Sequence, residues 1–116
     1  REGAVGFTDD GRPILDASLL RQAMETCRAL DVPISLHEED PAYIHQSGIN
    51  AGEAAQTLNI EGADRMAEIT MVERDLKIAA ETGVSLDIQH ISTKEAVELV
   101  RIAKRECSTI HAEATP

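Results

Sequence analysis

Three residues that could bind a metal ion stand at the ends of three different apolar stretches of the chain. They are Asp10, His37 and His90. Zinc accepts carboxylate oxygen and imidazole nitrogen, and a catalytic zinc site keeps one position open for water. Each residue alone also has an ordinary structural explanation, because Asp-Gly is a turn signal and a histidine at a strand end is often a hydrogen-bonded structural residue. The combination of all three, if the fold brings them together, predicts a metal site.

The elements that would position these residues alternate between strands and helices. Short apolar stretches predict four strands, at residues 3–8, 32–36, 84–91 and 109–114. Strand and helix alternation with right-handed crossovers makes a parallel sheet with helices packed on it, the α/β class. A doubly wound sheet and a TIM (β/α)8 barrel both begin this way, and in both the chemistry lies at the carboxyl ends of the strands. Such a sheet brings the three candidate ligands to one edge.

Helical periodicity fills the longer segments between the strands. The first predicted helix, capped by Asp16 or Ser18, has an apolar face made of Leu19, Leu20, Ala23, Met24, Cys27 and Leu30. The second spans 64–82, ends at Gly83, and has an apolar face made of Ile69, Val72, Leu76, Ala79 and Ala80. The third follows Ser92-Thr93-Lys94-Glu95, which matches a capping box with Ser92 as the cap.

Residues 41–63 are the least regular part of the chain. A proline and three glycines interrupt any long pattern, although 51–58 is compatible with a short helix. A connection of this length inside a compact domain usually has a function.

Composition excludes several classes of partner. The chain has 116 residues, enough for one domain, and a formal charge of −10, which disfavours nucleic acid and anionic membrane surfaces because both would repel it. No apolar run approaches the roughly 20 residues of a membrane helix, and no signal segment opens the chain. The spacing of Cys27 and Cys107 matches no metal-binding motif, and we expect both to be free thiols. Free thiols are typical of a reducing compartment, so we expect a cytoplasmic protein.

Strand alternation predicts opposite faces of the sheet for the side chains of the two candidate histidines. His37 shares parity with the polar Ser35, as a site residue should, whereas His90 shares parity with the apolar Leu86 and Ile88. A bulge in the third strand would reconcile the two, and so would an apolar layer that faces the site. The sequence leaves both open.

Other titratable residues near the strand ends have simpler interpretations. The acidic run 38–40 predicts a solvated turn, with orientation of His37 by these carboxylates as the alternative. We expect His45 to be an exposed loop residue. We expect His111 to be a structural residue on the fourth strand. The alternative is a position at the mouth of the site.

Four segments of the chain resemble bacterial dihydroorotase, in the same order and with similar spacing. They are Gly3-Ala4-Val5-Gly6-Phe7-Thr8-Asp9-Asp10-Gly11, Leu36-His37-Glu38-Glu39-Asp40, Gln89-His90-Ile91-Ser92-Thr93-Lys94-Glu95 and His111-Ala112-Glu113-Ala114-Thr115-Pro116. The resemblance implies that residues 1–116 form part of one amidohydrolase domain, a TIM barrel, at about its fourth to seventh strands. Because the chain begins without Met and ends directly after a strand, we expect an internal fragment.

The resemblance also implies a centre with two zinc ions. In the branch of the family with the pattern Phe-Thr-Asp-Asp-Gly, the second Asp bridges the zinc ions where many relatives use a carboxylated lysine, and this position is Asp10. The histidines that match the family, His37 and His90, complete the protein ligands of the second zinc. We expect the His-x-His pair, the proton-transferring Asp and the substrate-contacting Arg and Asn of the family to lie outside this chain.

The implied activity is the zinc-dependent, reversible conversion of dihydroorotate and N-carbamoyl-L-aspartate in pyrimidine biosynthesis, where zinc lowers the pKa of water and polarises the amide carbonyl. Two alternatives stay open. Another cyclic amidohydrolase, such as a hydantoinase or dihydropyrimidinase, is disfavoured because such relatives carry the bridging lysine in place of Asp10. A catalytically silent dihydroorotase-like subunit is disfavoured because all three expected ligands are present.

The expected partners are a small-molecule substrate, the remainder of the barrel, and either a second copy in a homodimer or aspartate transcarbamoylase. Half of a barrel leaves strand edges unpaired and one face of the sheet poorly covered. We therefore expect that this segment does not fold stably on its own.

Overall fold

The structure, a computed structural model, describes residues 3–45 and 48–114. Its elements are β1 (Phe7–Thr8), α1 (Ala17–Leu30), β2 (Ile34–Leu36), the 3-10 helix η1 (Pro41–Tyr43), α2 (Glu53–Thr57), α3 (Met66–Thr82), β3 (Leu86–Ile91), α4 (Lys94–Glu106) and β4 (Ile110–Ala114). The predicted alternation of strands and long helices is confirmed, and α2 is the short helix expected within 51–58. Thr115 and Pro116, which close the fourth quoted segment, lie outside the described residues.

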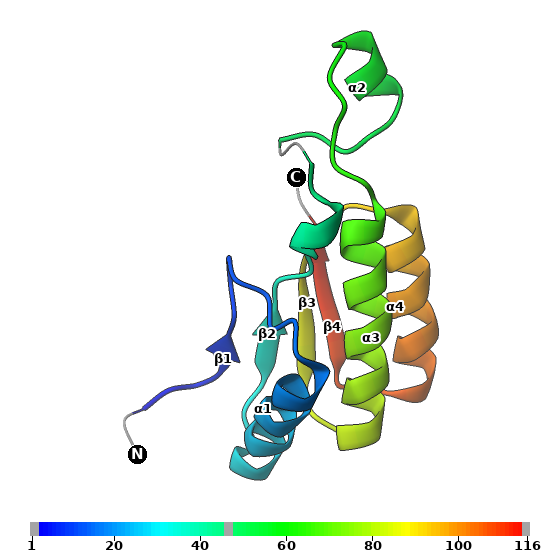
Figure 1. The fold of residues 1–116 in the computed structure, drawn as a ribbon. Coiled ribbons are helices and arrows are strands. Elements are labelled where there is room, and N and C mark those ends of the chain that lie inside the picture. Colours follow the sequence, from blue (N-terminus) through cyan, green and yellow to red (C-terminus); the bar gives the residue numbers. More distant parts are fainter. Residues whose placement is uncertain (1–2, 46–47, 115–116) are drawn as a thin grey trace.

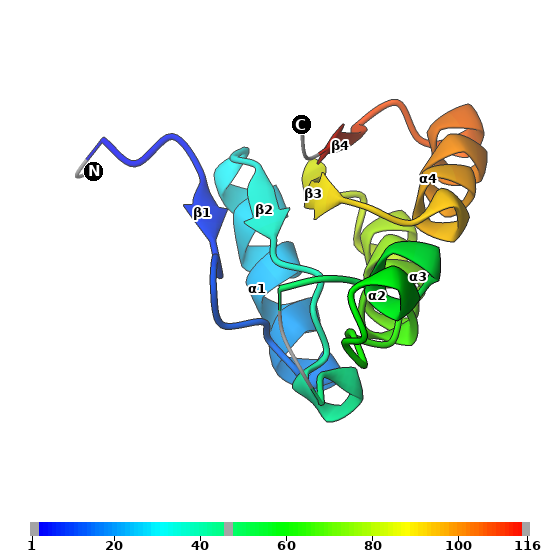
Figure 2. The same ribbon diagram turned by 90° about the horizontal axis from the view of Figure 1, so that it is seen from above.

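The strands form one parallel sheet in the order β1-β2-β3-β4, so each strand pairs with the next one in sequence. Helices α1, α3 and α4 all lie on the same side of this sheet (Figures 1 and 2). A doubly wound sheet reverses its strand order and carries helices on both faces, whereas consecutive units of a barrel keep sequential order and one-sided helices. The described residues therefore have the arrangement of consecutive barrel units.

The core lies between the sheet and the helices and is built from aliphatic side chains. Its fully buried members include Leu20, Met24, Leu36, Val72, Val84, Leu86, Ile88 and Ile110. The face expected for α1 is partly wrong, because Leu19 and Leu30 are 55% and 59% exposed. Both residues are rotated by roughly 80 to 100 degrees from the buried stripe that Leu20, Met24 and Cys27 form at helical spacing. Ala80, at the edge of the α3 stripe, is exposed as well.

Local caps determine where the long helices begin and end. Asp16 caps α1 by accepting two backbone amides, as expected, and Gly83 ends α3 in the left-handed conformation with a φ of 69°. The expected cap of α4 is wrong. Thr93, and not Ser92, accepts the amide of the first turn. The Ser92 hydroxyl donates instead to Glu68, a partner that is distant in sequence.

The connection between β2 and α3 rises above the carboxyl edge of the sheet as a small lobe that includes α2 (Figure 1). A bridge between Asn50 and Ala63 joins its two limbs, and Ala55 is 1% exposed. Gly62 has a φ of 76°, and a Cβ there would lie 2.7 Å from the backbone nitrogen of Ala51, so no side chain fits at this position. The segment is thus held by its own contacts. None of the described helices is both long and apolar enough to cross a membrane.

Candidate metal centre

The fold brings the three predicted ligands together at the carboxyl edge of the sheet. Asp10, His37 and His90 each offer one ligand atom, and these atoms lie within 4.8 Å of one another. Nδ1 of His37 is 2.8 Å from Nε2 of His90 and 3.9 Å from Oδ1 of Asp10. Zinc bonds to nitrogen and oxygen are roughly 2 Å long, which places neighbouring ligand atoms about 3.3 Å apart in a tetrahedral site. The three atoms are separated by 2.8 Å to at most 4.8 Å, so side-chain shifts of about 1 Å would let them reach one cation.

The centre is closed on the side of the sheet and open on the side of Asp10. The side chain of His37 is 14% exposed, whereas that of Asp10 is 64% exposed. The two imidazole rings meet edge to face, with centroids 4.7 Å apart. An open side leaves room for a further ligand, as a catalytic metal site requires.

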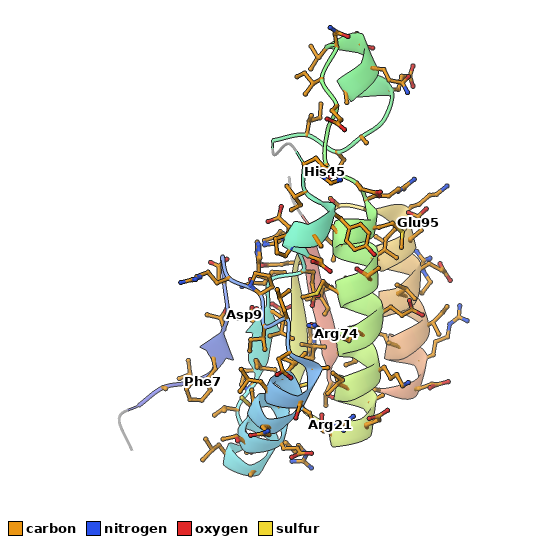
Figure 3. The ribbon with its side chains drawn as sticks, in the orientation of Figure 1. Phe7, Asp9, Arg21, His45, Arg74 and Glu95 are labelled. Carbon is orange, nitrogen blue, oxygen red and sulfur yellow. The ribbon has the colours of Figure 1, made fainter. Side chains whose placement is uncertain are left out.

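Asp9 fixes the turn that carries Asp10, a role that the sequence did not reveal. Its Oδ1 accepts the backbone amide of His37 at 2.8 Å, and its Oδ2 accepts the amide of Ile14 at 2.9 Å. The turn closes where the amide of Arg12 donates to the Asp9 carbonyl at 2.8 Å. A single carboxylate, visible beyond β1 in Figure 3, thus ties the loop of one candidate ligand to the backbone of the next.

A bulge in β3 turns His90 toward the centre. Ile88 pairs with Ala112 and Ile91 with Ala114, so three steps along β3 match two along β4. His90 has a φ of 37°, outside the region that residues with a Cβ usually occupy. The extra residue lets Ile88 and Ile91 both stay buried while His90 faces His37. The bulge therefore explains how His90, which shares parity with buried residues of β3, can still face the site.

The acidic run that follows His37 is not uniformly solvated. The side chain of Glu39 is 48% exposed, and its Oε2 lies 3.1 Å from Nε2 of His37. Asp40 caps η1. Glu38, in contrast, is only 3% exposed, so the expectation of a solvated turn is wrong for this residue. Its side chain continues the parity of Ile34 and Leu36 and enters the layer between the sheet and the helices.

The two remaining histidines lie away from the centre. His45 is exposed, as expected, and Figure 3 shows it on the segment above the sheet. His111 is in register with Asp87, which is in register with Ser35. Because His37 comes two residues after Ser35, His111 lies one layer nearer the amino ends of the strands.

A charged cluster is buried between the sheet and α3, next to the strand end that carries His37. Asp75 is 2% exposed, and Nη2 of Arg74 donates to its Oδ2 at 3.1 Å. Neither oxygen of Glu38 has a donor partner among the described residues unless Glu38 and Asp75 share a proton. Burial and the nearby charge of Asp75 raise the pKa of Glu38 well above its ordinary value. Burial also raises the pKa of Asp75, against the opposing effect of Arg74, so the two acids favour holding a proton over carrying two charges.

Arg74 also connects this cluster to the loop of Asp10. Its guanidinium donates to the carbonyls of Ile14 and Leu15 at 2.8 and 2.9 Å. Figure 3 shows Arg74 on α3, beside the segment that leads from β1 into α1. Five donors in a planar group let one arginine serve a carboxylate and two carbonyls at once. No sequence pattern indicated this role, because Arg74 lies on a helical segment with ordinary spacing.

Glu68, near the start of the same helix, binds the segment that follows His90. It is 9% exposed. Its Oε2 accepts the amide and the hydroxyl of Ser92, both at 2.8 Å, and its Oε1 accepts the amide and the hydroxyl of Thr93 at 2.9 and 2.7 Å. Helix α3 thus contacts the segments that follow the first and third candidate ligands, and the backbone carbonyl of Ala67 accepts the amide of Asp40 after the second.

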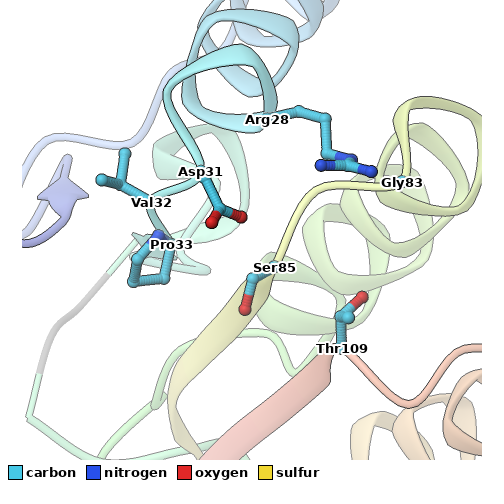
Figure 4. Close-up of a pocket in the computed structure, with 7 residues that line it drawn as sticks. All are labelled: Arg28, Asp31, Val32, Pro33, Gly83, Ser85 and Thr109. Carbon is cyan, nitrogen blue, oxygen red and sulfur yellow. The ribbon is translucent and has the colours of Figure 1, made fainter.

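Two pockets lie at opposite edges of the sheet. The pocket in Figure 4, about 450 Å³, lies at the amino ends of β2, β3 and β4 and is lined by Arg28, Asp31, Val32, Pro33, Gly83, Ser85 and Thr109. A smaller pocket of about 180 Å³ lies at the carboxyl edge and is lined in part by Glu39, Asn50, Glu68, His90 and Ser92. The larger pocket contains none of the three candidate ligands. In parallel α/β folds the chemistry lies at the carboxyl edge, so we assign the functional site there.

Curated relatives with this sequence pattern are dihydroorotases. The chain is 48% identical over 114 residues to the dihydroorotase of Clostridium acetobutylicum, covering 98% of this chain and 27% of that protein. It is 47% identical over 116 residues to the dihydroorotase of Clostridioides difficile, covering 100% of this chain and 28% of that protein. The chain thus spans little more than a quarter of the length of these relatives.

Solved structures with a similar fold include hydantoinases and a dihydropyrimidinase. An L-hydantoinase from Arthrobacter aurescens matches with a TM-score of 0.75 and 23% identity, covering 98% of this chain and 28% of that one. A dihydropyrimidinase from Brevibacillus agri matches with a TM-score of 0.70 and 17% identity, covering 98% and 26%. These likenesses establish the fold, a segment of a TIM barrel. Since the sequence profile of the dihydro-orotase-like family also matches residues 1–96, the chain belongs to that family.

Proposed function

We propose that this chain supplies part of the metal centre of a dihydroorotase, which interconverts dihydroorotate and N-carbamoyl-L-aspartate by opening and closing a cyclic amide. The observation that carries the proposal is the convergence of Asp10, His37 and His90, whose ligand atoms lie within 4.8 Å of one another. The curated relatives named dihydroorotase, at 47 and 48% identity, support the choice of substrate. The remainder of the centre and the substrate contacts belong to the longer protein.

The donor set fits zinc. Two imidazole nitrogens and one carboxylate oxygen are the ligand types that zinc prefers at catalytic sites. Metal-bound histidines usually donate their second ring N–H to a carboxylate or carbonyl, which fixes the tautomer. Glu39 is placed for this, because its Oε2 lies 3.1 Å from Nε2 of His37. A proton on Nε2 leaves Nδ1 of His37 with the free lone pair that a metal ligand needs.

The chemistry divides between the cation and the protein. When bound, zinc supplies a Lewis acid that activates water and polarises the amide carbonyl. Asp10, His37 and His90 would contribute ligands to a centre of two zinc ions, and the exposed side of Asp10 leaves the centre open to substrate. Asp9 keeps the loop of Asp10 at a fixed distance from the backbone of His37. The protein's contribution in this segment is therefore a preformed arrangement of ligands, with proton transfer and substrate binding expected elsewhere in the longer protein.

A hydantoinase or dihydropyrimidinase activity is the second candidate, favoured by the fold alone. The hydantoinase structures are 23% identical or less, whereas the dihydroorotases are close to half identical. Turnover of dihydroorotate but not of dihydrouracil by the full-length protein supports our proposal, and the reverse preference would contradict it. A silent subunit that assists aspartate transcarbamoylase would turn over neither substrate.

The proposal is tested with full-length protein carrying Asp10→Ala or His37→Ala, and with His45→Ala as the control histidine at an exposed position. Removal of a ligand should lower both zinc content and dihydroorotate turnover by more than the roughly 10- to 100-fold that loss of an outer partner costs. His45→Ala should retain both. Full activity of the Asp10→Ala protein, or full activity without metal, would overturn the assignment. With both cysteines free, the proposal also places the enzyme in the cytoplasm.

A further inference from the structure

We infer that Glu68 is a positioning residue for His90, an inference that rests on the proposed metal centre. The starting point is the unfavourable backbone of His90. A φ of 37° is unfavourable for a residue with a Cβ, and such a conformation persists only where the surroundings impose it.

The segment before His90 is held by the sheet. Leu86 and Ile88 are paired with β4 and fully buried, so β3 is fixed up to the bulge. Beyond the bulge, the last sheet pair within residues 3–45 and 48–114 is Ile91 with Ala114. A single pair at the end of a strand is a weak constraint, because strand ends fray. The direction of the chain after His90 therefore depends on what binds residues 92 and 93.

Glu68 binds both of these residues with its whole hydrogen-bonding capacity. Its two oxygens accept four hydrogen bonds, two from backbone amides and two from hydroxyls, at 2.7 to 2.9 Å. Amide donors constrain the backbone itself, and a bidentate arrangement fixes both direction and distance. Glu68 is 9% exposed, so water competes poorly for these donors.

The anchor is rigid because Glu68 belongs to the first turns of α3, a helix of 17 residues with eight buried members. The preceding residue, Ala67, accepts the amide of Asp40 at 2.9 Å from the segment that follows His37. One turn of α3 therefore holds the chain just after both histidines. This common support accounts for the 2.8 Å separation of their ring nitrogens across two strands.

The competing explanation gives Glu68 a purely structural role at the start of α4, where a carboxylate stabilises the first turn of a helix. The two explanations predict different effects on metal binding. A structural role changes only the stability of the fold. A positioning role changes how well His90 reaches the metal, even in a protein that is fully folded.

The test is Glu68→Gln in the full-length protein, with Glu73→Gln, an exposed carboxylate on the same helix, as the matched control. Because the NH2 group of glutamine is itself a donor, it cannot replace one of the two acceptor oxygens. We expect zinc affinity, measured by competition with a chelator, to fall about 10- to 100-fold and the visible spectrum of the cobalt-loaded protein to change. Glu73→Gln should leave affinity and spectrum as they are.

A second variant covers the case in which Glu68→Gln does not fold. Ser92→Ala removes one of the four hydrogen bonds and should weaken zinc binding in the same direction by a smaller factor. In a His90→Ala background, Glu68→Gln should cause no further loss of affinity, because its effect passes through His90.

The outcomes separate the two proposals. If the parent protein binds zinc and turns over dihydroorotate while Glu68→Gln loses only thermal stability, the positioning role is overturned and the function stands. A further loss of affinity in the His90→Ala background also overturns it. A parent protein that binds no zinc overturns the proposed function itself.

Discussion

Two carboxylates, one on helix α3 and one packed against it, are both buried, but their surroundings are opposite. Glu68 is 9% exposed and accepts four hydrogen bonds from two neighbouring residues. Glu38 is 3% exposed, and neither of its oxygens has a donor partner among residues 3–45 and 48–114 unless it shares a proton with Asp75. Burial of a carboxylate is costly in proportion to the hydrogen bonds that it fails to recover. The supply of donors, more than the depth of burial, therefore decides what a buried acid contributes to stability here.

Arg74 satisfies only part of the buried acidic cluster, because it supplies donors to Asp75 but not to Glu38. Its charge nevertheless opposes the rise in the pKa of Glu38 that burial and Asp75 cause. The region around Glu38 thus depends on one cation, whereas the region around Glu68 depends on several neutral donors. Substitutions should affect the two regions in different ways and with different dependence on pH.

The largest effect is expected for Arg74→Met in the full-length protein, which leaves Asp75 buried without its partner. Breaking a buried ion pair from one side costs roughly 3 to 5 kcal/mol. The folded-state pKa of Asp75 is already raised, so its folded form holds a proton above the unfolded pKa of about 3.9, and the deficit should grow as pH rises above that value. Urea unfolding at pH 4 and pH 7 measures this, and an equal deficit at both would contradict the explanation.

A somewhat smaller effect is expected for Glu68→Leu, which leaves two amides and two hydroxyls without their acceptor. Hydroxyls can rotate toward other acceptors, but the amides cannot, and we expect a loss of about 3 kcal/mol in unfolding free energy. The same unfolding measurements apply, with Glu73→Leu as the exposed control on the same helix. A loss below about 0.5 kcal/mol would show that the four hydrogen bonds add little to stability.

An effect of opposite sign is expected for Glu38→Gln. The wild-type carboxyl has a raised folded-state pKa, so its stabilising contribution falls as pH rises above the unfolded value of about 4.3. A glutamine has no charge to desolvate and can donate to Asp75, so the variant should be more stable near neutral pH by roughly 1 kcal/mol. The gain should shrink toward pH 4. A variant that is less stable at neutral pH would indicate that Glu38 has a partner in the longer protein.

The smallest effect is expected for Glu39→Gln, which changes an exposed carboxylate next to the buried Glu38. Its side chain is 48% exposed, so the unfolding free energy should change by no more than about 0.5 kcal/mol. Its contact with His37 should appear instead in zinc affinity, with a loss of about 10-fold. A loss of unfolding free energy as large as that of Glu68→Leu would contradict the expected difference between buried and exposed acids.

Much of the fold could be predicted from sequence, because the signals for it are local. Apolar stretches and helical periodicity gave the order of the strands and long helices, and the parallel sheet then placed Asp10, His37 and His90 at one edge. The cap at Asp16 and the helix end at Gly83 were equally local. The role of the three residues as ligands stays a prediction until metal is measured.

The remaining features could not be predicted because they depend on partners distant in sequence. The cap of α4 moved from Ser92 to Thr93 because Glu68, 24 positions earlier, takes the Ser92 hydroxyl. Glu38 was expected in solvent because the acidic run looks uniform, whereas α3 covers only one of its three members. Asp9 and Arg74 act on segments 28 and about 60 positions away, and no local pattern marks such contacts.

The irregular step in β3 has a consequence for anyone who aligns, truncates or redesigns this strand. A procedure that counts alternate residues would assign His90 to the hydrophobic interior, and a scaffold with an unbroken ladder would present the imidazole to the wrong face. Removing a single residue from the loop-side end of β3 would eliminate the bulge and change the register of the residues that follow it, and with that the ligand geometry. A graft of this centre must therefore carry the supernumerary residue together with its left-handed backbone.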